Sequence, residues 1–211
     1  MIVRFQTLLS LTLIFFGCGG GSGHNPPVAR PTAVGYTANI NDNTVTSFLL
    51  DESTGGLTLV ATAPTGALPT HPVVTPDHRL LFVSNFQDGT ISRFLLDGNG
   101  GMKSAGNAIH LLTTGASPGK ITISPSGQFL YVGAGSSNQV EVFQINAETG
   151  DLQPIQESPF AANSGGGVLV LSHSGRLLFA AGNDAIDVFA VDTTGALSLL
   201  ETTHADSQTE R

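Results

Sequence analysis

The sequence has no tryptophan, a single cysteine and few charged residues, which make up 11% of its 211 positions. Basic residues are scarce: 8 Lys and Arg stand against 16 Asp and Glu, which gives a net charge of −8. A surface of that sign repels phosphate backbones and no Lys/Arg cluster offsets it, so we expect no nucleic-acid partner. Low charge together with 26 glycines and many β-branched residues favours an all-β domain over a helix bundle.

The apolar run near the N-terminus is short. Phe5–Phe16 has 12 residues and follows a start that carries Arg4. That length suits the core of a signal peptide and is too short to span a membrane. We therefore predict a signal peptide over residues 1–17 and export of the remaining chain.

Cys18 follows this run directly after Gly17. As the only cysteine it cannot form a disulfide within the chain. Its position resembles the lipobox of bacterial lipoproteins, in which a small residue precedes an acylated cysteine. The resemblance implies a lipid anchor on Cys18 and a Gly- and Pro-rich tether over residues 18–32, so that the protein contacts a membrane only through the anchor. The alternative is an ordinary signal peptide followed by an incidental cysteine.

An internal repeat dominates the remaining chain. Aromatic residues recur at intervals of 46, 49 and 48 residues. Each is followed by an apolar residue, which lies nine residues on in the first three copies and seven in the fourth, and from that residue a Phe lies three and an Asp or Asn six residues further. We expect the Phe column to pack in the core and the acidic column to form turns. The columns are Tyr36, Phe82, Tyr131 and Phe179; Val45, Ile91, Val140 and Ile186; Phe48, Phe94, Phe143 and Phe189; and Asp51, Asp97, Asn146 and Asp192.

Each copy of the repeat reads as short strands joined by tight turns. Ser124–Gly127 has Pro at the second and Gly at the fourth position, which is typical of a type I turn. The segment Val140–Ile145 alternates as a half-buried antiparallel strand does. A four-stranded unit with a period in the forties is typical of a β-propeller blade. We predict an all-β, partial β-propeller over residues 33–211, with antiparallel blades at about 33–64, 65–113, 114–160 and 161–204.

The repeat resembles that of the YVTN, lactonase-type seven-bladed propellers, the family that includes bacterial 6-phosphogluconolactonase. The residues that carry the resemblance are Ser124–Gly127, Leu130–Val132, Val140–Phe143, Leu81–Asn85 and Leu178–Phe179. The resemblance covers residues 33–201 and implies the blade fold. These motifs are specific for the blade and not for an activity, since one fold hosts many functions.

The number of copies limits the architecture. The first copy lacks its innermost strand and the other three have four strands each, so the repeat predicts 15 strands, or nearly four blades. A fragment of a longer propeller is the favoured interpretation. A compact four-bladed ring and the self-association of two arcs are the alternatives, because an open arc leaves an uncovered blade face.

Residues that depart from the repeat are the candidates for function. Aligning Pro69 with Pro118 places His71 opposite Lys120, at the start of two innermost strands. These two residues are weak candidates for a catalytic base and an electrostatic clamp on an anionic lactone, or for a solvated loop pair. Gly115–Gly119 fits the pattern G-x-S-x-G but lies in a predicted loop with no strand-to-helix elbow, so we reject it as a nucleophile motif. No metal-binding or phosphate-binding motif occurs, and we expect no cofactor and no metal.

Two functions remain open. The resemblance to the lactonase family implies hydrolysis of a small-molecule sugar lactone. The predicted signal peptide implies that the protein is exported and is either lipid-anchored in the bacterial cell envelope or periplasmic or extracellular. The alternative is a non-catalytic propeller of the bacterial cell envelope that binds a cell-surface protein or glycan through its loops.

Overall fold

The structure is a computed structural model that describes residues 33–182 and 184–204. The predicted signal peptide, Cys18 and the tether lie outside these residues. The described chain folds into 17 β-strands in four antiparallel sheets, and its one helical element is the 3₁₀ turn η1 (Gly135–Ser137). The all-β prediction is therefore confirmed. No helix among the described residues is long and apolar enough to cross a membrane.

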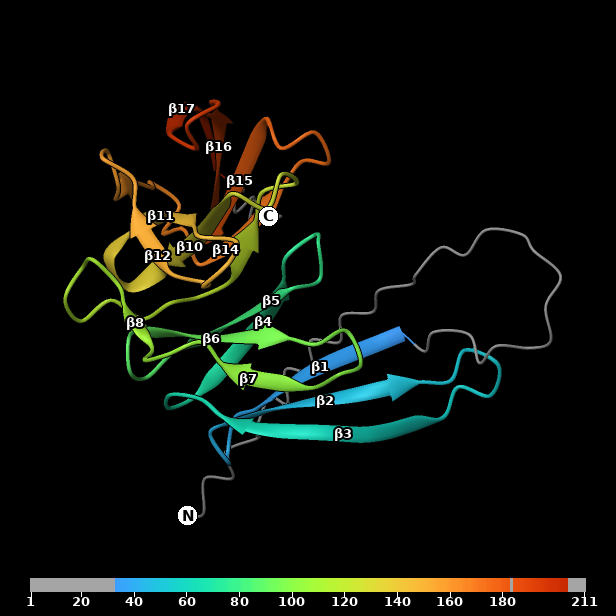
Figure 1. The fold of residues 1–211 in the computed structure, drawn as a ribbon. Coiled ribbons are helices and arrows are strands. Elements are labelled where there is room, and N and C mark those ends of the chain that lie inside the picture. Colours follow the sequence, from blue (N-terminus) through green and yellow to red (C-terminus); the bar gives the residue numbers. More distant parts are fainter. Residues whose placement is uncertain (1–32, 183, 205–211) are drawn as a thin grey trace, which may run out of the picture.

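The four sheets follow one another in chain order, as Figure 1 shows from blue to red. The first has three strands: β1 (Ala33–Asn39), β2 (Thr44–Leu50) and β3 (Leu57–Pro64). The second is built of β4 (Pro69–Val74), β5 (Leu80–Asn85), β6 (Thr90–Leu96), β7 (Met102–Ser104) and β8 (Ile109–His110). The third is built of β9 (Ile121–Ile123), β10 (Phe129–Ala134), β11 (Gln139–Ile145), β12 (Leu152–Pro154) and β13 (Phe160–Ala161). The fourth is built of β14 (Val168–Leu171), β15 (Leu177–Gly182), β16 (Ala185–Val191) and β17 (Leu197–His204).

The strand count differs from the predicted 15 because two outer strands are interrupted. In the second sheet β7 and β8 both pair with β6, and in the third β12 and β13 both pair with β11. Counting each interrupted strand once restores the predicted three strands in the first sheet and four in each of the others. The sheets thus form successive blades of a partial propeller, and among the described residues the first and fourth sheets share no strand pairing.

Repeated turns explain where the strands end. The backbone N–H of Gly127 donates to the Ser124 carbonyl (2.9 Å), as the type I turn requires, and Gly127 adopts a φ of +74°. In the second sheet His78 takes the equivalent left-handed position, with a φ of 59°. The Asp and Asn column also forms turns as predicted: the Asp51 carboxylate accepts from the N–H of Ser53 (2.8 Å), and equivalent bonds occur at Asp97, Asn146 and Asp192. The hydroxyl and N–H of Ser53 lower the pKa of Asp51 to about 2.

The core consists of three apolar clusters, one between each pair of successive sheets. The Phe column always faces the preceding sheet: Phe94, Phe143 and Phe189 are buried there, as predicted. The aromatic marker of each blade faces the next sheet, where Tyr36, Phe82 and Tyr131 are buried. Phe48 and Phe179 lie at the two ends of the row of sheets and are only half-buried.

The prediction that Val140–Ile145 forms a half-buried strand is wrong for most of that strand. The alternation of Val140–Ile145 predicted a half-buried strand, yet β11 is buried on both faces from Val140 to Phe143. The reason is that the third sheet lies between two other sheets, so this part of β11 is covered on both faces. The polar Glu141 is therefore fully buried and needs partners inside the protein.

Candidate functional site

The innermost strands of the sheets contact one another in the order β1, β4, β9 and β14. Register places His71 and Lys120 at equivalent points, because the next residues, Pro72 and Ile121, pair with Val83 and Val132 of their own sheets. The same rule puts Val168 at the equivalent point of the fourth sheet. The structure therefore brings His71 and Lys120 to neighbouring inner strands, at the end where the chain passes from one sheet to the next.

His71 has an unusual environment for an ionisable group. Its side chain is half-buried, and its Nδ1 atom is buried without a hydrogen-bond partner among the described residues. The backbone N–H of His71 donates to the Ser84 hydroxyl (3.2 Å), which holds this part of β4 against β5. Burial, and then the positive charge of Lys120, lower the pKa of His71 below its ordinary value of 6.5. The imidazole is therefore neutral at pH 7 and can accept a proton.

Backbone contacts between two sheets hold Lys120. Its N–H donates to the Gly167 carbonyl (3.1 Å) ahead of β14, and its carbonyl accepts from the Gly133 N–H (3.0 Å) of β10. The main chains come so close here that a Cβ on Gly119 would lie 2.5 Å from the Gly167 carbonyl oxygen, and a Cβ on Gly133 would overlap the Gly166 carbonyl. We call this contact the glycine seam (Gly119, Gly133, Gly166 and Gly167).

The G-x-S-x-G segment lies in the loop between β8 and β9, which confirms that it is no nucleophile elbow. Ser117 is held there by its N–H, which donates to the Ser136 hydroxyl (3.0 Å). Ser117 also lines a pocket of about 260 Å³ together with Asp88 and His110. Neither His71 nor Lys120 lines this pocket.

Buried carboxylates anchor the loops that lead into the third and fourth sheets. Glu141 accepts from the backbone N–H groups of Leu112 (2.8 Å) and Thr113 (3.0 Å). Asp187 accepts from the N–H of Ser164 (2.8 Å) and from the hydroxyl of Thr202 (2.6 Å). Glu141 therefore fixes the loop that ends at Lys120, and it is a positioning residue for the candidate site.

In the first two sheets a different pair of side chains forms the polar contact at the position of Glu141 and Asp187. There the column of Glu141 and Asp187 is occupied by Thr46 and Ser92, and an Asn of the preceding strand donates to each hydroxyl, Asn39 at 2.7 Å and Asn85 at 2.9 Å. In the third and fourth sheets the Asn position holds the small residues Ala134 and Gly182, which leave room for a carboxylate. The sequence analysis missed Glu141 and Asp187. They stand out when the Asn column and the Thr, Ser, Glu and Asp column are compared across the four copies, because a small residue in the first column accompanies a carboxylate in the second.

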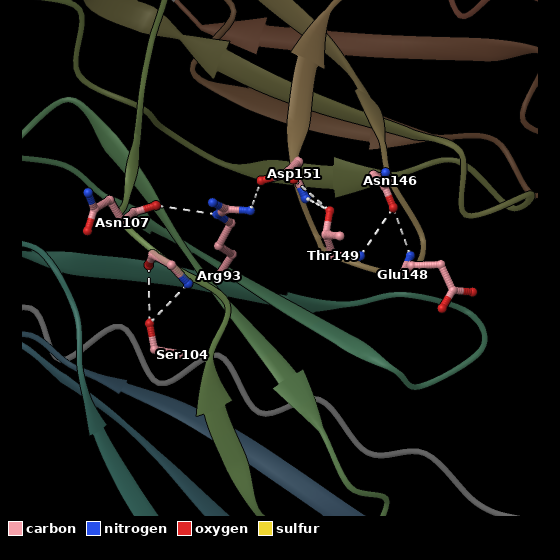
Figure 2. Close-up of polar contacts among 8 residues, drawn as sticks. Arg93, Ser104, Asn107, Asn146, Glu148, Thr149 and Asp151 are labelled. Carbon is pink, nitrogen blue, oxygen red and sulfur yellow. Dashed lines mark hydrogen bonds and ion pairs between the residues drawn. The ribbon is translucent and has the colours of Figure 1, made fainter.

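A polar contact also links the second and third sheets (Figure 2). Arg93 of β6 crosses to Asp151, which follows the turn before β12, and forms an ion pair with it. Its Nε donates to the Asn107 carbonyl (3.3 Å), within the segment that interrupts β7 and β8. The Thr149 hydroxyl (2.7 Å), followed by Arg93, holds the pKa of Asp151 below its usual value. The cluster joins two blades on the outer side of the sheets and takes no part in the His71 site.

No group of three or more His, Cys, Asp or Glu residues within 33–182 and 184–204 is arranged to hold a metal ion. The acid–base candidates that the sequence singled out, His71 and Lys120, lie at equivalent points of neighbouring inner strands, and the charge of Lys120 acts on His71. A neutral base and a cation are the two kinds of group that act on an ester or lactone carbonyl.

Comparisons with known proteins agree on the architecture. The 6-phosphogluconolactonase of Bacillus subtilis (strain 168) is 31% identical over 100 residues, which are 44% of this chain and 29% of the relative. A Bacteroides fragilis structure superposes with a TM-score of 0.73 at 20% identity, covering 87% of this chain and 56% of the other. The periplasmic gluconolactonase of Pseudomonas aeruginosa gives a TM-score of 0.71 at 21% identity, with 82% and 52% covered.

The chain thus spans about half the length of the solved structures that it matches and less than a third of the curated relative. The family profile described as "Lactonase, 7-bladed beta-propeller" matches residues 28–120 and 107–170, more than half of the sequence. With four successive blades of the matching repeat in the structure, the chain belongs to the lactonase family of seven-bladed β-propellers.

Proposed function

We propose that the protein hydrolyses a sugar lactone near the N-terminal ends of the innermost strands β4 and β9. The observation that carries the proposal is a neutral His71 on one inner strand that feels the charge of Lys120 at the equivalent point of the neighbouring inner strand. Support also comes from relatives named as a 6-phosphogluconolactonase and a periplasmic gluconolactonase.

The chemistry follows from the two side chains. His71 accepts a proton from water as the water oxygen attacks the lactone carbonyl carbon. Lys120 stabilises the negative charge that develops on the carbonyl oxygen. The ring C–O bond then breaks, and the leaving oxygen takes a proton, so that lactone and water become a hydroxy acid.

Turnover of δ-gluconolactone and 6-phosphogluconolactone tests this proposal, with acid release followed against the uncatalysed rate. We expect His71→Ala to lower kcat/KM by about 10²–10⁴-fold, the usual contribution of a general base. His173→Ala is the matched control, because His173 is exposed in a turn at the opposite end of the sheets. A wild-type rate equal to background, or a His71→Ala enzyme as fast as wild type, would contradict the proposal.

The pH dependence provides a sharper test. The base form of His71 is active, so kcat/KM should fall as the pH drops through the lowered pKa of His71. Lys120→Met removes a positive charge that lowers this pKa. The acid limb of the profile should therefore move to higher pH in Lys120→Met. A merely structural role for Lys120 would change the rate and leave the limb in place.

We also propose that the protein is exported and anchored through Cys18, on the strength of the apolar run and Gly17-Cys18. Expression in a Gram-negative host with an alkyne-tagged palmitate should label the wild-type chain and not Cys18→Ser. The intact mass shows whether residues 1–17 are removed. A signal peptide of the ordinary kind should be removed from the wild-type chain and from Cys18→Ser, whereas one of the lipoprotein kind should be removed from the wild-type chain alone. A cytosolic chain that retains residues 1–17 would rule out export.

A second candidate is a non-catalytic propeller that binds a cell-surface protein or glycan. The observation in its favour is the exposure of two large apolar side chains, Phe86 and Leu112, on loops at the same end of the sheets as His71. Glycan or protein binding that is lost in Phe86→Ala, without lactone turnover in wild type, would establish this function instead.

A further inference from the structure

A pocket of about 460 Å³ lies where the loop after β3 passes the second sheet. Its walls come from β6, from the chain on both sides of the break between β7 and β8, and from residues 64–66. Asp88 and His110 line this pocket and also the smaller pocket described above, whereas His71 and Lys120 line neither. The volume is in the range of about 300–1,000 Å³ that is usual for ligand-binding pockets.

The pocket lies over a bulge in the outer edge of the second sheet. Register pairs Ile91 with Ile109 and Phe94 with Ser104. Between these pairs, two residues of β6 lie opposite four residues of the outer chain, 105–108. The outer chain therefore forms no regular strand in this stretch, and residues on both sides of the bulge line the pocket.

The first and fourth sheets show what the bulge replaces. In the first sheet the Thr62 hydroxyl on the continuous strand β3 hydrogen-bonds the Thr46 hydroxyl (3.0 Å). In the fourth sheet the Thr202 hydroxyl on β17 donates to Asp187 (2.6 Å). Ser92 belongs to the same column, and no described side chain of its outer chain bonds it. The second sheet thus leaves open, beside Ser92, a place that a Thr hydroxyl occupies in those two sheets.

Two buried hydroxyl groups present hydrogen-bond donors to the pocket. The Nδ2 of Asn85 donates to the hydroxyls of Thr90 (2.9 Å) and Ser92 (2.9 Å), and the Gly66 N–H also donates to Ser92 (3.2 Å). Both hydroxyl oxygens are therefore acceptors here, and no described residue accepts either O–H proton. Thr90 and Ser92 are 4% and 6% exposed, and both line the pocket. Buried donors of this kind favour a ligand oxygen as their acceptor.

Asp88 supplies the complementary acceptor. Its Oδ2 accepts from the Ala67 N–H (2.6 Å), which uses one of about four acceptor positions on a carboxylate. Arg93 is the only Lys or Arg in the described lining, and its guanidinium is engaged by Asp151 and by the Asn107 carbonyl (Figure 2). No unpaired Lys or Arg therefore balances the charge of Asp88, so the pocket disfavours an anion such as phosphate or a sugar acid.

We propose that this pocket binds a neutral saccharide, whose hydroxyl groups both accept and donate hydrogen bonds. One sugar oxygen accepts from Thr90 or Ser92, and a neighbouring sugar hydroxyl donates to the Asp88 carboxylate. Pro64 and Ala108, both exposed, offer apolar surface to the C–H groups of the sugar ring. A metal ion does not suit hydroxyl groups that present their protons. The proposal does not rest on lactone hydrolysis.

Calorimetric titration and saturation-transfer NMR of the full 211-residue chain test the proposal, with D-glucose, D-galactose, N-acetyl-D-glucosamine and maltose as probes. We expect at least one of them to bind with a dissociation constant on the order of 1 mM, because one sugar unit makes few contacts. Thr90→Val keeps the shape of the side chain and removes one donor, so it should weaken binding about two- to tenfold. Ala108→Trp places a large side chain on the exposed lining and should weaken binding at least tenfold.

Ala147→Trp is the matched control, because Ala147 is also exposed and lies between β11 and β12, outside this pocket. It should bind the sugar as wild type does. Circular dichroism checks the fold of each variant, and Thr90→Val carries the test if Ala108→Trp does not fold.

Three results would overturn the proposal. The first is no binding of any of the four sugars at about 100 mM, or binding that Ala108→Trp leaves unchanged. The second is binding of sodium phosphate or sodium gluconate, lost in Ala108→Trp, in place of the neutral sugars. The third is sugar binding that is lost in His71→Ala and kept in Ala108→Trp, which would place the sugar at the candidate catalytic site instead.

Discussion

Replacing Glu141 with alanine should lower the free energy of unfolding by about 3–5 kcal/mol, because a buried group loses its partner. Glu141 is fully buried and accepts from the N–H groups of Leu112 and Thr113. Alanine leaves both donors unsatisfied inside the protein and also creates a cavity. Urea denaturation followed by circular dichroism measures the change. The fold of residues 111–120 should loosen first, so a reduced rate of lactone hydrolysis should accompany the loss.

The repeat supplies both a control and a rescue for this experiment. Glu201→Ala removes an exposed carboxylate from β17 and should change stability by no more than about 0.5 kcal/mol. Ala134→Asn with Glu141→Ser recreates the pair of the second sheet, Asn85 and Ser92. The double variant should recover part of the stability lost in Glu141→Ala. An effect of Glu141→Ala as small as that of Glu201→Ala would show that the loop does not depend on the carboxylate.

Phe143→Ala should destabilise the protein by about 3–5 kcal/mol, the usual cost of truncating a buried Phe. Phe143 is 1% exposed and packs in the cluster between the second and third sheets, which includes Phe82 and Leu130. Thermal unfolding of the variant should begin at a clearly lower temperature.

Phe48→Ala is the matched comparison, because Phe48 occupies the same column and is only half-buried. We expect it to cost about 1 kcal/mol, since less apolar area is lost from the interior. Equal costs for the two variants would mean that the column does not owe its stability to the neighbouring sheet.

The repeat made most of this fold predictable. Turn residues such as Pro125 and Gly127 and the aromatic columns define where strands begin and how sheets pack, and these are local or periodic properties. The breaks between β7 and β8 and between β12 and β13 were not predictable. The first of them accommodates Arg93, whose partners Asn107 and Asp151 belong to two different sheets, so no short segment of sequence encodes the break.

The candidate site was predictable only in part. The alignment of Pro69 with Pro118 was enough to place His71 opposite Lys120, because strand register follows the turns. The buried Glu141 was missed, since alternation in one strand suggests a solvent-facing carboxylate unless both faces of the sheet are known to be covered. The lowered pKa of His71 depends on burial and on a charge from another sheet, and neither is visible in the residues around it.

The glycine seam has a consequence for how the inner end of the sheets can change during evolution. Between β9 and β14 the contact near Lys120 is made by main-chain amides and carbonyls, because Gly119 and Gly133 leave no space for a side chain. New ligand specificity cannot arise there by substitution, and a library that randomises these positions should return glycine. Variation is left to positions outside the seam: Lys120 and Val168, which follow its glycines in the chain, and His71 on the neighbouring inner strand.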